Sequence, residues 1–432
     1  FGRLDGSGPH EVPDYIELPS EMTGVEARIL LAIGNRFPMI RAHKVLAAYS
    51  CLVPRLVTGR FDPTAHRAVW PSTGNYARGG IAISRTMDCR GVAVLPEGMS
   101  KARFDWLEQW TLDPTNDIIR TPGTESNVKE IYDACNELEQ DPEIEIINQF
   151  SEFSNHLGHY AVTGPALGRV FEHATAGRSD ARLVAFVSAS GSAGTLGAGD
   201  YLKDTYGSRI VAVEALECPT MLENGFGDHN IQGIGDKHVP LIHNVMNTDD
   251  VVAVSDRSTD ALDAVFNTDA GKAHLVDRVG LEPALVDMLV HMGYSAIANA
   301  LAAITIAKDR GLGHDDVIVT VATDGSELYD SEREEYLAHH HANGYDAVAA
   351  ASDFARELEA GDTAQHLELT EQERRRVFNL GYFTWVEQQG TSFEDFTARG
   401  EQSFWDGMRH FIGEWDEQVR EFNARTGTRD DD

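Results

Sequence analysis

The sequence predicts an α/β fold, because short apolar runs alternate with amphipathic stretches of helical spacing. Four apolar runs are typical of buried strands, at 91–95, 183–187, 210–213 and 317–321. The stretch from Ser100 to Trp110 follows the first of them with helical spacing, and Ser100 is expected to cap that helix. Strands and helices in this alternation indicate parallel sheets.

The composition is that of a globular protein with an unusually acidic surface. At 432 residues the chain is long enough for two domains, and 42% hydrophobic residues is an ordinary share. No apolar run approaches the roughly 18 residues of a membrane span. A net charge of -33 repels nucleic acid and anionic membranes, so we expect neither as a partner. The charge has two explanations, adaptation to high salt or an acidic protein of a GC-rich genome, and neither bears on the chemistry.

The cysteines and histidines predict neither disulfides nor a metal site. No C-x-x-C pair occurs among Cys51, Cys89, Cys135 and Cys218. We therefore expect reduced thiols in a cytoplasmic protein, and the first residues show no signal pattern. The adjacent histidines at 339–341 lie in a polar stretch, which is more typical of an exposed loop or helix end than of metal ligands.

Three local features point to a cofactor that carries both an aldehyde and a phosphate. The segment 191–195 lies between a predicted strand and helix, where backbone N–H groups and the helix dipole attract an anion. The segment 72–76 is another candidate helix start, suited to a substrate carboxylate. Lys44 precedes the apolar run 45–48, so its amine could be partly buried, as imine chemistry requires.

Each feature alone has an ordinary structural explanation. A loop of Gly, Ser and Ala is often only a tight turn, a Ser/Thr segment often only caps a helix, and most lysines are solvated. Taken in order, an imine-forming amine, an asparagine loop and a phosphate-binding turn are the parts that pyridoxal 5'-phosphate requires.

The order of short motifs from about Arg41 to Tyr329 resembles the cysteine synthase/cystathionine β-synthase family, whose members are fold-type II pyridoxal-phosphate enzymes. The lysine of that family corresponds to Lys44 in His43-Lys44, and its T-S-G-N-T-G loop to 72–77. Its further motifs are P-x-x-M-S at 96–100, Q-F at 149–150, H-Y-x-T-T-G-P at 159–165, G-T-G-G-T at 191–195 and H-K-I-Q-G-I-G followed by V-P at 229–240.

The resemblance implies a role for each matching residue. Lys44 would bind pyridoxal phosphate as an imine and move the Cα proton, and Asn75 would hydrogen-bond the ring hydroxyl. The residues of the phosphate loop would be Gly191, Ser192, Ala193, Gly194 and Thr195. The residues around the substrate carboxylate would be Ser72, Thr73, Gly74, the backbone at Tyr76, and Gln149. Gly233 would lie in the loop that approaches the substrate amine.

The sequence departs from the family pattern at three places. The family sets a neutral Ser or Thr against the pyridine nitrogen, where the nearest alignment here gives Asp324, with Thr323 or Ser326 as alternatives after a small shift. A carboxylate there would favour a protonated ring and a stronger electron sink, although Asp324 could equally cap a turn. Tyr76 replaces a small Thr, so the pocket is expected to be reshaped or partly filled. Ser192-Ala193 replaces Thr-Gly, which backbone binding tolerates.

The resemblance also implies an architecture like that of the tryptophan synthase β subunit, with two α/β domains and the cofactor in the cleft between them. We expect an N-terminal arm and the start of the large domain in 1–40. The region 41–165 would contain the smaller, mobile domain with the Asn75 loop, and 166–345 the large cofactor-binding domain. An acidic, helical extension is expected in 346–432, with its aromatic residues packed on the main body or on a second subunit of a homodimer.

The reaction expected from the resemblance is β-replacement on an activated serine, O-acetylserine or O-phosphoserine, by sulfide or a thiol through an aminoacrylate. The alternative is β-elimination, as in a cysteine desulfhydrase, because both reactions share that species. A non-catalytic binding protein on the same scaffold is a third reading, and retention of Lys44 argues against it.

Overall fold

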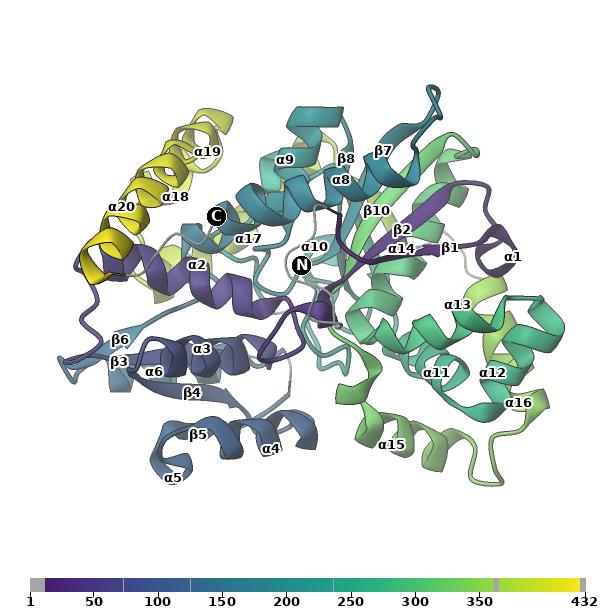
Figure 1. Cartoon of the computed structure of the whole chain (residues 1–432), viewed down its shortest axis with the longest axis horizontal. Coiled ribbons are helices and arrows are strands. Elements are labelled where there is room, and N and C mark those ends of the chain that lie inside the picture. Colours follow the sequence, from purple (N-terminus) through teal and green to yellow (C-terminus); the bar gives the residue numbers. More distant parts are fainter. Residues whose placement is uncertain (1–11, 73, 125, 236, 361–364, 428–432) are drawn as a thin grey trace.

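The chain folds into two α/β units followed by a largely helical extension (Figure 1). The computed structural model describes residues 12–72, 74–124, 126–235, 237–360 and 365–427. Each unit is built on its own sheet. The predicted α/β fold is confirmed, and every strand expected from the sequence is present.

The larger sheet has a parallel interior and an antiparallel strand at each edge. Its strands, in spatial order, are β1 (Tyr15–Leu18), β2 (Arg28–Ile33), β10 (Asp316–Ala322), β7 (Arg182–Ala189), β8 (Arg209–Ala215), β9 (Asp250–Val254) and β11 (His366–Glu368). Because β7 and β10 are parallel neighbours, the loops that follow them lie side by side at one edge of the sheet. The predicted site segments at 191–195 and 323–326 are in those loops.

The smaller sheet is parallel throughout its described strands. In spatial order these are β5 (Ile118–Thr121), β4 (Arg90–Pro96), β3 (Arg67–Pro71) and β6 (Ile144–Ile146). The loop after β3 is the predicted substrate loop, so it too leaves the carboxyl end of a parallel strand.

The helices cover both sheets (Figure 1). Those packed with the smaller sheet are α2 (Lys44–Val57), α3 (Asn75–Thr86), α4 (Lys101–Trp110), α5 (Pro114–Asp117) and α6 (Val128–Leu138). Those of the larger unit are α1 (Ser20–Thr23), α7 (Phe153–Gly158), α8 (Gly164–Ala174), α9 (Leu196–Tyr206), α10 (Thr220–Glu223), α11 (Asp256–Asn267), α12 (Asp269–His274), α13 (Pro283–Met288), α14 (Tyr294–Arg310) and α15 (Asp330–His340). Among the described residues no single helix is long and apolar enough to cross a membrane; only the bent pair Pro283–His291 and Tyr294–Arg310 reaches that length and composition together.

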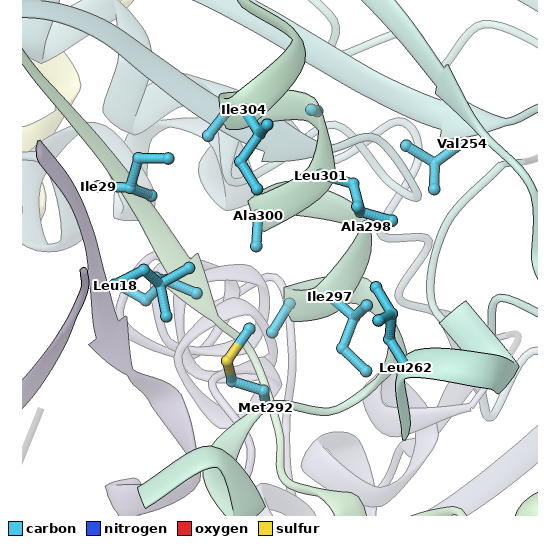
Figure 2. Close-up of a cluster of buried hydrophobic side chains, with 14 of the residues drawn as sticks. Leu18, Ile29, Val254, Leu262, Met292, Ile297, Ala298, Ala300, Leu301 and Ile304 are labelled. Atoms are coloured by element: carbon cyan, nitrogen blue, oxygen red, sulfur yellow. The ribbon is translucent and has the colours of Figure 1, made fainter. Parts of the chain in front are cut away.

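The helix α14 forms the centre of the main hydrophobic core. Figure 2 shows Ile297 and Ala300 of α14 between Ile29 of β2 on one side and Leu262 of α11 on the other. All four side chains are at least 95% buried. This packing fixes the start of α14 beside the loop that follows β10, where the site lies.

One local prediction on α4 is wrong in its detail. The helix begins after Ser100 as expected, but the Ser100 hydroxyl does not cap a backbone N–H. It accepts a hydrogen bond from Nη1 of Arg103 at 2.8 Å instead. A buried guanidinium is the stronger competitor for that hydroxyl.

The C-terminal extension comprises α16 (Ala347–Phe354), α17 (Glu371–Tyr382), α18 (Phe393–Ala398), α19 (Gln402–Met408) and α20 (His410–Thr426). It also supplies the edge strand β11, so it is not purely helical as the sequence suggested. Trp385 packs against Tyr132 of α6 and donates Nε1–H to the Val239 carbonyl at 2.8 Å. Packing of the aromatic residues on the main body is confirmed for Trp385 and Trp405, whereas Phe383 is 68% exposed.

Candidate active site

Loops from both units line one cavity between them. Its wall consists of His43, Lys44, Ser72, Gly74, Asn75, Tyr76, Gln149, Ala189, Gly191, Ser192, Ala193, Thr195, Gln232, Gly233, Ser295, Thr323 and Asp324. The wall includes every site residue predicted from the sequence except Gly194, which lies within the same loop, and Thr73, which lies outside the described residues. Residues far apart in the chain are therefore gathered in one place.

The Lys44 amine lies where the predicted substrate and phosphate segments meet. Lys44 is the first residue of α2, and its Nζ donates to Gln149 Oε1 at 3.0 Å and to Ser192 Oγ at 3.1 Å. Lys101 and Lys129 differ, since they are exposed and form ion pairs with aspartates on their own helices. The fold thus sets Lys44 apart from the ordinary surface lysines of the chain.

The residue before this lysine adds no positive charge to the cavity. His43 is 3% exposed, and its ring lies 5.3 Å from that of His159. Burial, followed by the charges of His159 and Lys44, lowers the pKa of His43 well below its ordinary value. His43 is therefore neutral at pH 7, and the amine is not repelled by a second cation beside it.

The loop 191–195 is a close-packed turn that opens α9. A Cβ atom on Gly191 would lie 2.4 Å from the carbonyl oxygen of Gly233, and one on Gly194 would lie 2.4 Å from Asn155 Oδ1. Only glycine allows the loop to approach its neighbours so closely. Because α9 starts at Leu196, its dipole and free N–H groups act at this turn, as a phosphate site requires.

Ala193 occupies a backbone conformation that favours glycine, with φ at 63°. An L-residue with a Cβ pays about 1–2 kcal/mol there. We expect Ala193→Gly to lower the free energy of unfolding less than the control Ala198→Gly does, and the difference should be at least about 1 kcal/mol. Ala198 is a matched control because it is also buried but lies within the helix α9. Urea unfolding of both variants measures the difference. Equal losses for the two variants would show that the turn is not strained.

Two residues of the site escaped the sequence analysis. Asn155 Nδ2 donates to Ser192 Oγ at 3.1 Å and to the Gln149 carbonyl at 3.0 Å, so it ties the two predicted segments together. Gln232 lies on the cavity wall. The sequence offered one signal for Gln232, its place in the motif at 229–235, and none for Asn155.

The predicted substrate loop turns into α3 at the cavity. The Gly74 N–H donates to Ser72 Oγ at 2.8 Å, and Gly74 has φ at 149°. Asn75 is the first residue of α3; its Nδ2 donates to Asp324 Oδ2 at 2.6 Å and its Oδ1 accepts from Arg78 at 2.8 Å. Asn75 therefore joins the smaller unit to the loop that follows β10.

Tyr76 belongs to the cavity wall and also to the core of the smaller unit. Its ring lies edge-on to Trp70 at 5.5 Å, and its hydroxyl donates to the Ile147 carbonyl at 3.1 Å. The side chain is 1% exposed. The hydroxyl is thus engaged in the core, where it is not available to a substrate.

We expect Tyr76→Phe to cost about 1 kcal/mol of stability and to leave the substrate KM unchanged, because only the buried hydrogen bond is lost. Tyr76→Thr, which introduces the residue of the related family, is expected to cost about 3–5 kcal/mol by opening a cavity in the core. Chemical unfolding and steady-state kinetics check both variants. A raised KM for Tyr76→Phe at full stability would instead place the hydroxyl in substrate binding.

Asp324 is a buried carboxylate on the cavity wall. Its Oδ2 accepts from Asn75 and, at 3.0 Å, from the Tyr329 hydroxyl. Its Oδ1 is buried and has no hydrogen-bond partner among the described residues. Burial raises the pKa of Asp324, and the charge of Arg103 and the two hydrogen bonds oppose that rise.

The two alternatives to Asp324 differ in position. The Thr323 hydroxyl borders the cavity and lies 2.7 Å from the hydroxyl of Ser295. Ser326 is buried and is not part of the cavity wall. Asp324 and Thr323 can therefore face a ligand in the cavity.

The described residues fit pyridoxal phosphate. The glycine loop leaves no room for a Cβ and opens a helix, which suits a phosphate. The amine of Lys44 lies beside that loop. The unpartnered Oδ1 of Asp324 is an acceptor suited to a ring N–H.

Comparisons with known proteins agree with this fit. Residues 35–324 match the family model described as pyridoxal-phosphate dependent enzyme. The chain is 28% identical over 263 residues to cysteine synthase B of Campylobacter jejuni, covering 58% of this chain and 75% of that protein. It is 28% identical over 313 residues to cysteine synthase 3 of Caenorhabditis elegans, covering 71% and 82%.

Solved structures share the fold. An O-acetylserine dependent cystathionine β-synthase from Helicobacter pylori matches with a TM-score of 0.60 and 20% identity, covering 76% of this chain and 96% of that one. A hydrogen sulfide-producing enzyme from Fusobacterium nucleatum matches with a TM-score of 0.59 and 19% identity, covering 73% and 96%. The fold of two α/β units is therefore a known architecture.

Proposed function

Because the chain belongs to the pyridoxal-phosphate dependent enzyme family, we propose that it catalyses β-replacement on an activated serine, joining sulfide or a thiol to the β-carbon. The observation that carries the proposal is the position of Lys44. Its Nζ contacts Gln149 and Ser192 at once, so it adjoins both the segment suited to a substrate carboxylate and the one suited to phosphate. The similarity to cysteine synthases supports the choice of substrate.

The substrate side of the site follows from these contacts. Bound pyridoxal phosphate supplies an electron-withdrawing ring that makes the Cα proton of an amino acid removable. Lys44 would carry the cofactor and, once the substrate amine has displaced it, would move that proton at its free Nζ. The substrate carboxylate lies at the start of α3, held by the residues of that loop and a glutamine: Ser72, Thr73, Gly74, the Tyr76 backbone and Gln149.

The remaining assignments concern the cofactor. The loop 191–195 would hold its phosphate, and Asn75 would hydrogen-bond its ring hydroxyl. Asp324, or alternatively Thr323, would face the ring nitrogen. Gly233, on the cavity wall, would lie in the loop that approaches the substrate amine.

The second candidate is β-elimination, such as release of sulfide from cysteine. The observation that favours it is the buried carboxylate of Asp324 where related enzymes have a neutral hydroxyl. A carboxylate stabilises a protonated ring, which strengthens the electron sink and eases removal of the Cα proton, so this departure from the related enzymes favours a change of reaction.

The test supplies the protein with pyridoxal phosphate and compares two reactions. In the first, O-acetylserine or O-phosphoserine is mixed with sulfide and cysteine is measured; in the second, cysteine is supplied and pyruvate and sulfide are measured. The proposal expects kcat/KM for cysteine formation to exceed that for sulfide release. The reverse order would establish the lyase, and turnover in neither reaction would leave a binding protein on this scaffold.

We also propose that the protein is a cytoplasmic homodimer. An apolar groove between α2 and α20 is lined in part by Leu46, Tyr49 and Val162, and the last two are 43% and 42% exposed. All four cysteines are free and buried, which is typical of a reducing compartment. Light scattering should give twice the mass of the chain, whereas the mass of one chain would overturn the dimer.

A further inference from the structure

A buried network ties the smaller unit to Asp324. Asn75 of α3 donates to Asp324 Oδ2 at 2.6 Å, and Nη2 of Arg103 on α4 lies 3.7 Å from the same oxygen. Arg103 Nη2 also donates to the Tyr329 hydroxyl at 3.0 Å, and that hydroxyl donates to Asp324 Oδ2 at 3.0 Å. The contacts of Asn75 and Arg103 cross from one unit to the other.

Arg103 is held in one position and does not border the cavity. Its side chain is 1% exposed and lies over the Tyr329 ring at 5.1 Å. Nη1 donates to Ser100 Oγ at 2.8 Å and to Gln232 Oε1. A Cβ atom on Gly74 would lie 3.0 Å from Nε, so the guanidinium packs directly behind the substrate loop. Arg103 therefore reaches the site only through its neighbours.

The charge of Arg103 explains how Asp324 can remain ionised although its side chain is buried. A buried carboxylate takes up a proton unless a cation or hydrogen bonds stabilise its charge. Burial raises the pKa of Asp324, and among the opposing causes the charge of Arg103 is the largest. The hydrogen bonds from Tyr329 and Asn75 follow.

Two further charged groups face the network. Arg78 of α3 is 4% exposed and donates to Asn75, and its pKa is lowered to about 10 by burial and by the charge of Arg103. Glu327 is a nearby carboxylate whose charge raises the pKa of Asp324. A guanidinium keeps its proton in proteins, so Arg103 is a fixed charge and Asp324 is the group that changes.

We propose that Arg103 is a positioning residue that keeps Asp324 in its carboxylate form against the cofactor ring and links that charge to the smaller unit. This proposal rests on one part of the proposed function, namely that the ring of pyridoxal phosphate lies against Asp324. Its Oδ1 has no partner among the described residues, which leaves it to accept the ring proton. Without Arg103, Asp324 loses the largest influence that favours its carboxylate form, and α4 loses the hydrogen bonds that Arg103 donates to Gln232 and Tyr329.

The first test uses the protein without cofactor and compares Arg103→Met with wild type. When the pKa of an aspartate is higher in the folded than in the unfolded protein, the free energy of unfolding falls as pH rises from about 4, the unfolded value, through the folded pKa. The charge of Arg103 opposes the rise in the folded pKa of Asp324 and so limits this fall. We expect the stability deficit of Arg103→Met to grow as pH rises, to shrink in Arg103→Lys, and to lose its pH dependence when Asp324→Asn is added.

The second test loads the same variants with pyridoxal phosphate and records visible absorbance and affinity against pH. We expect the spectrum of wild type to stay constant around neutral pH and that of Arg103→Met to titrate, with affinity lowered at least about tenfold. Arg103→Lys should restore the constant spectrum. The proposal is overturned if the stability deficit of Arg103→Met is the same at every pH and adds fully to the deficit of Asp324→Asn. Arg103 would then have a packing role alone.

The two tests separate this inference from the proposed function. Failure of wild type to bind pyridoxal phosphate would defeat both. Binding without β-replacement would defeat the reaction alone, since the coupling between Arg103 and Asp324 is measured without substrate.

Discussion

Replacing Lys44 by alanine is expected to end covalent attachment of the cofactor and to lower kcat about 10⁴-fold, as loss of a proton-transfer group does. The amine contacts the side chains of both Gln149 and Ser192, and no other lysine lies on the cavity wall formed by the described residues. Steady-state kinetics and the visible absorbance of the purified variant measure the two effects.

The control for that variant is Lys129→Ala. Lys129 is exposed on α6 and pairs with Asp133 one turn further on, a surface ion pair worth little. It should retain the absorbance and turnover of wild type. Turnover that survives in Lys44→Ala would remove Lys44 from the chemistry.

Gly191→Ala is expected to weaken binding of pyridoxal phosphate by about 10- to 100-fold, because the added Cβ would lie 2.4 Å from the carbonyl oxygen of Gly233. The atoms that the new methyl group would meet are backbone, so relief requires the phosphate loop or the 233 loop to move. Titration of the cofactor, followed by fluorescence, measures the affinity.

The matched control is Gly407→Ala. Gly407 lies in α19 with an ordinary backbone conformation, and the space that an added methyl group would occupy is open. This variant should bind the cofactor as wild type does. Equal affinity of Gly191→Ala and wild type would mean that the loop does not hold the phosphate.

The sequence predicted the parts of the site that depend on local pattern. Apolar runs followed by Gly-rich or polar loops are visible in the sequence, so the segments at 72–76 and 191–195 stand out without the structure, whereas 323–326 was implied only by the resemblance to the family. Their meeting depends on long-range packing, since Lys44 and its partner Ser192 are 148 residues apart. The order of the strands in the sheets brings these segments together, and local sequence patterns do not encode that order.

Other features could not be predicted from the sequence, because contacts formed only in the folded protein decide them. Ser100 was expected to cap α4 but binds the buried Arg103, because a guanidinium in the core competes for every nearby oxygen. Tyr76 was expected to reshape or partly fill the pocket; it lines the cavity, and its hydroxyl is bound in the core of the smaller unit, which the sequence did not indicate. The strand β11 within the extension is short and forms only by pairing with β9. The Thr73 assignment lies outside the described residues and stays a prediction.

The most direct test of the central role of Lys44 is borohydride reduction of the protein loaded with pyridoxal phosphate, followed by peptide mass mapping. We expect the reduced pyridoxyl group on the peptide that contains Lys44. The group on a peptide of another lysine, such as Lys203 or Lys308, or on none, would contradict that role.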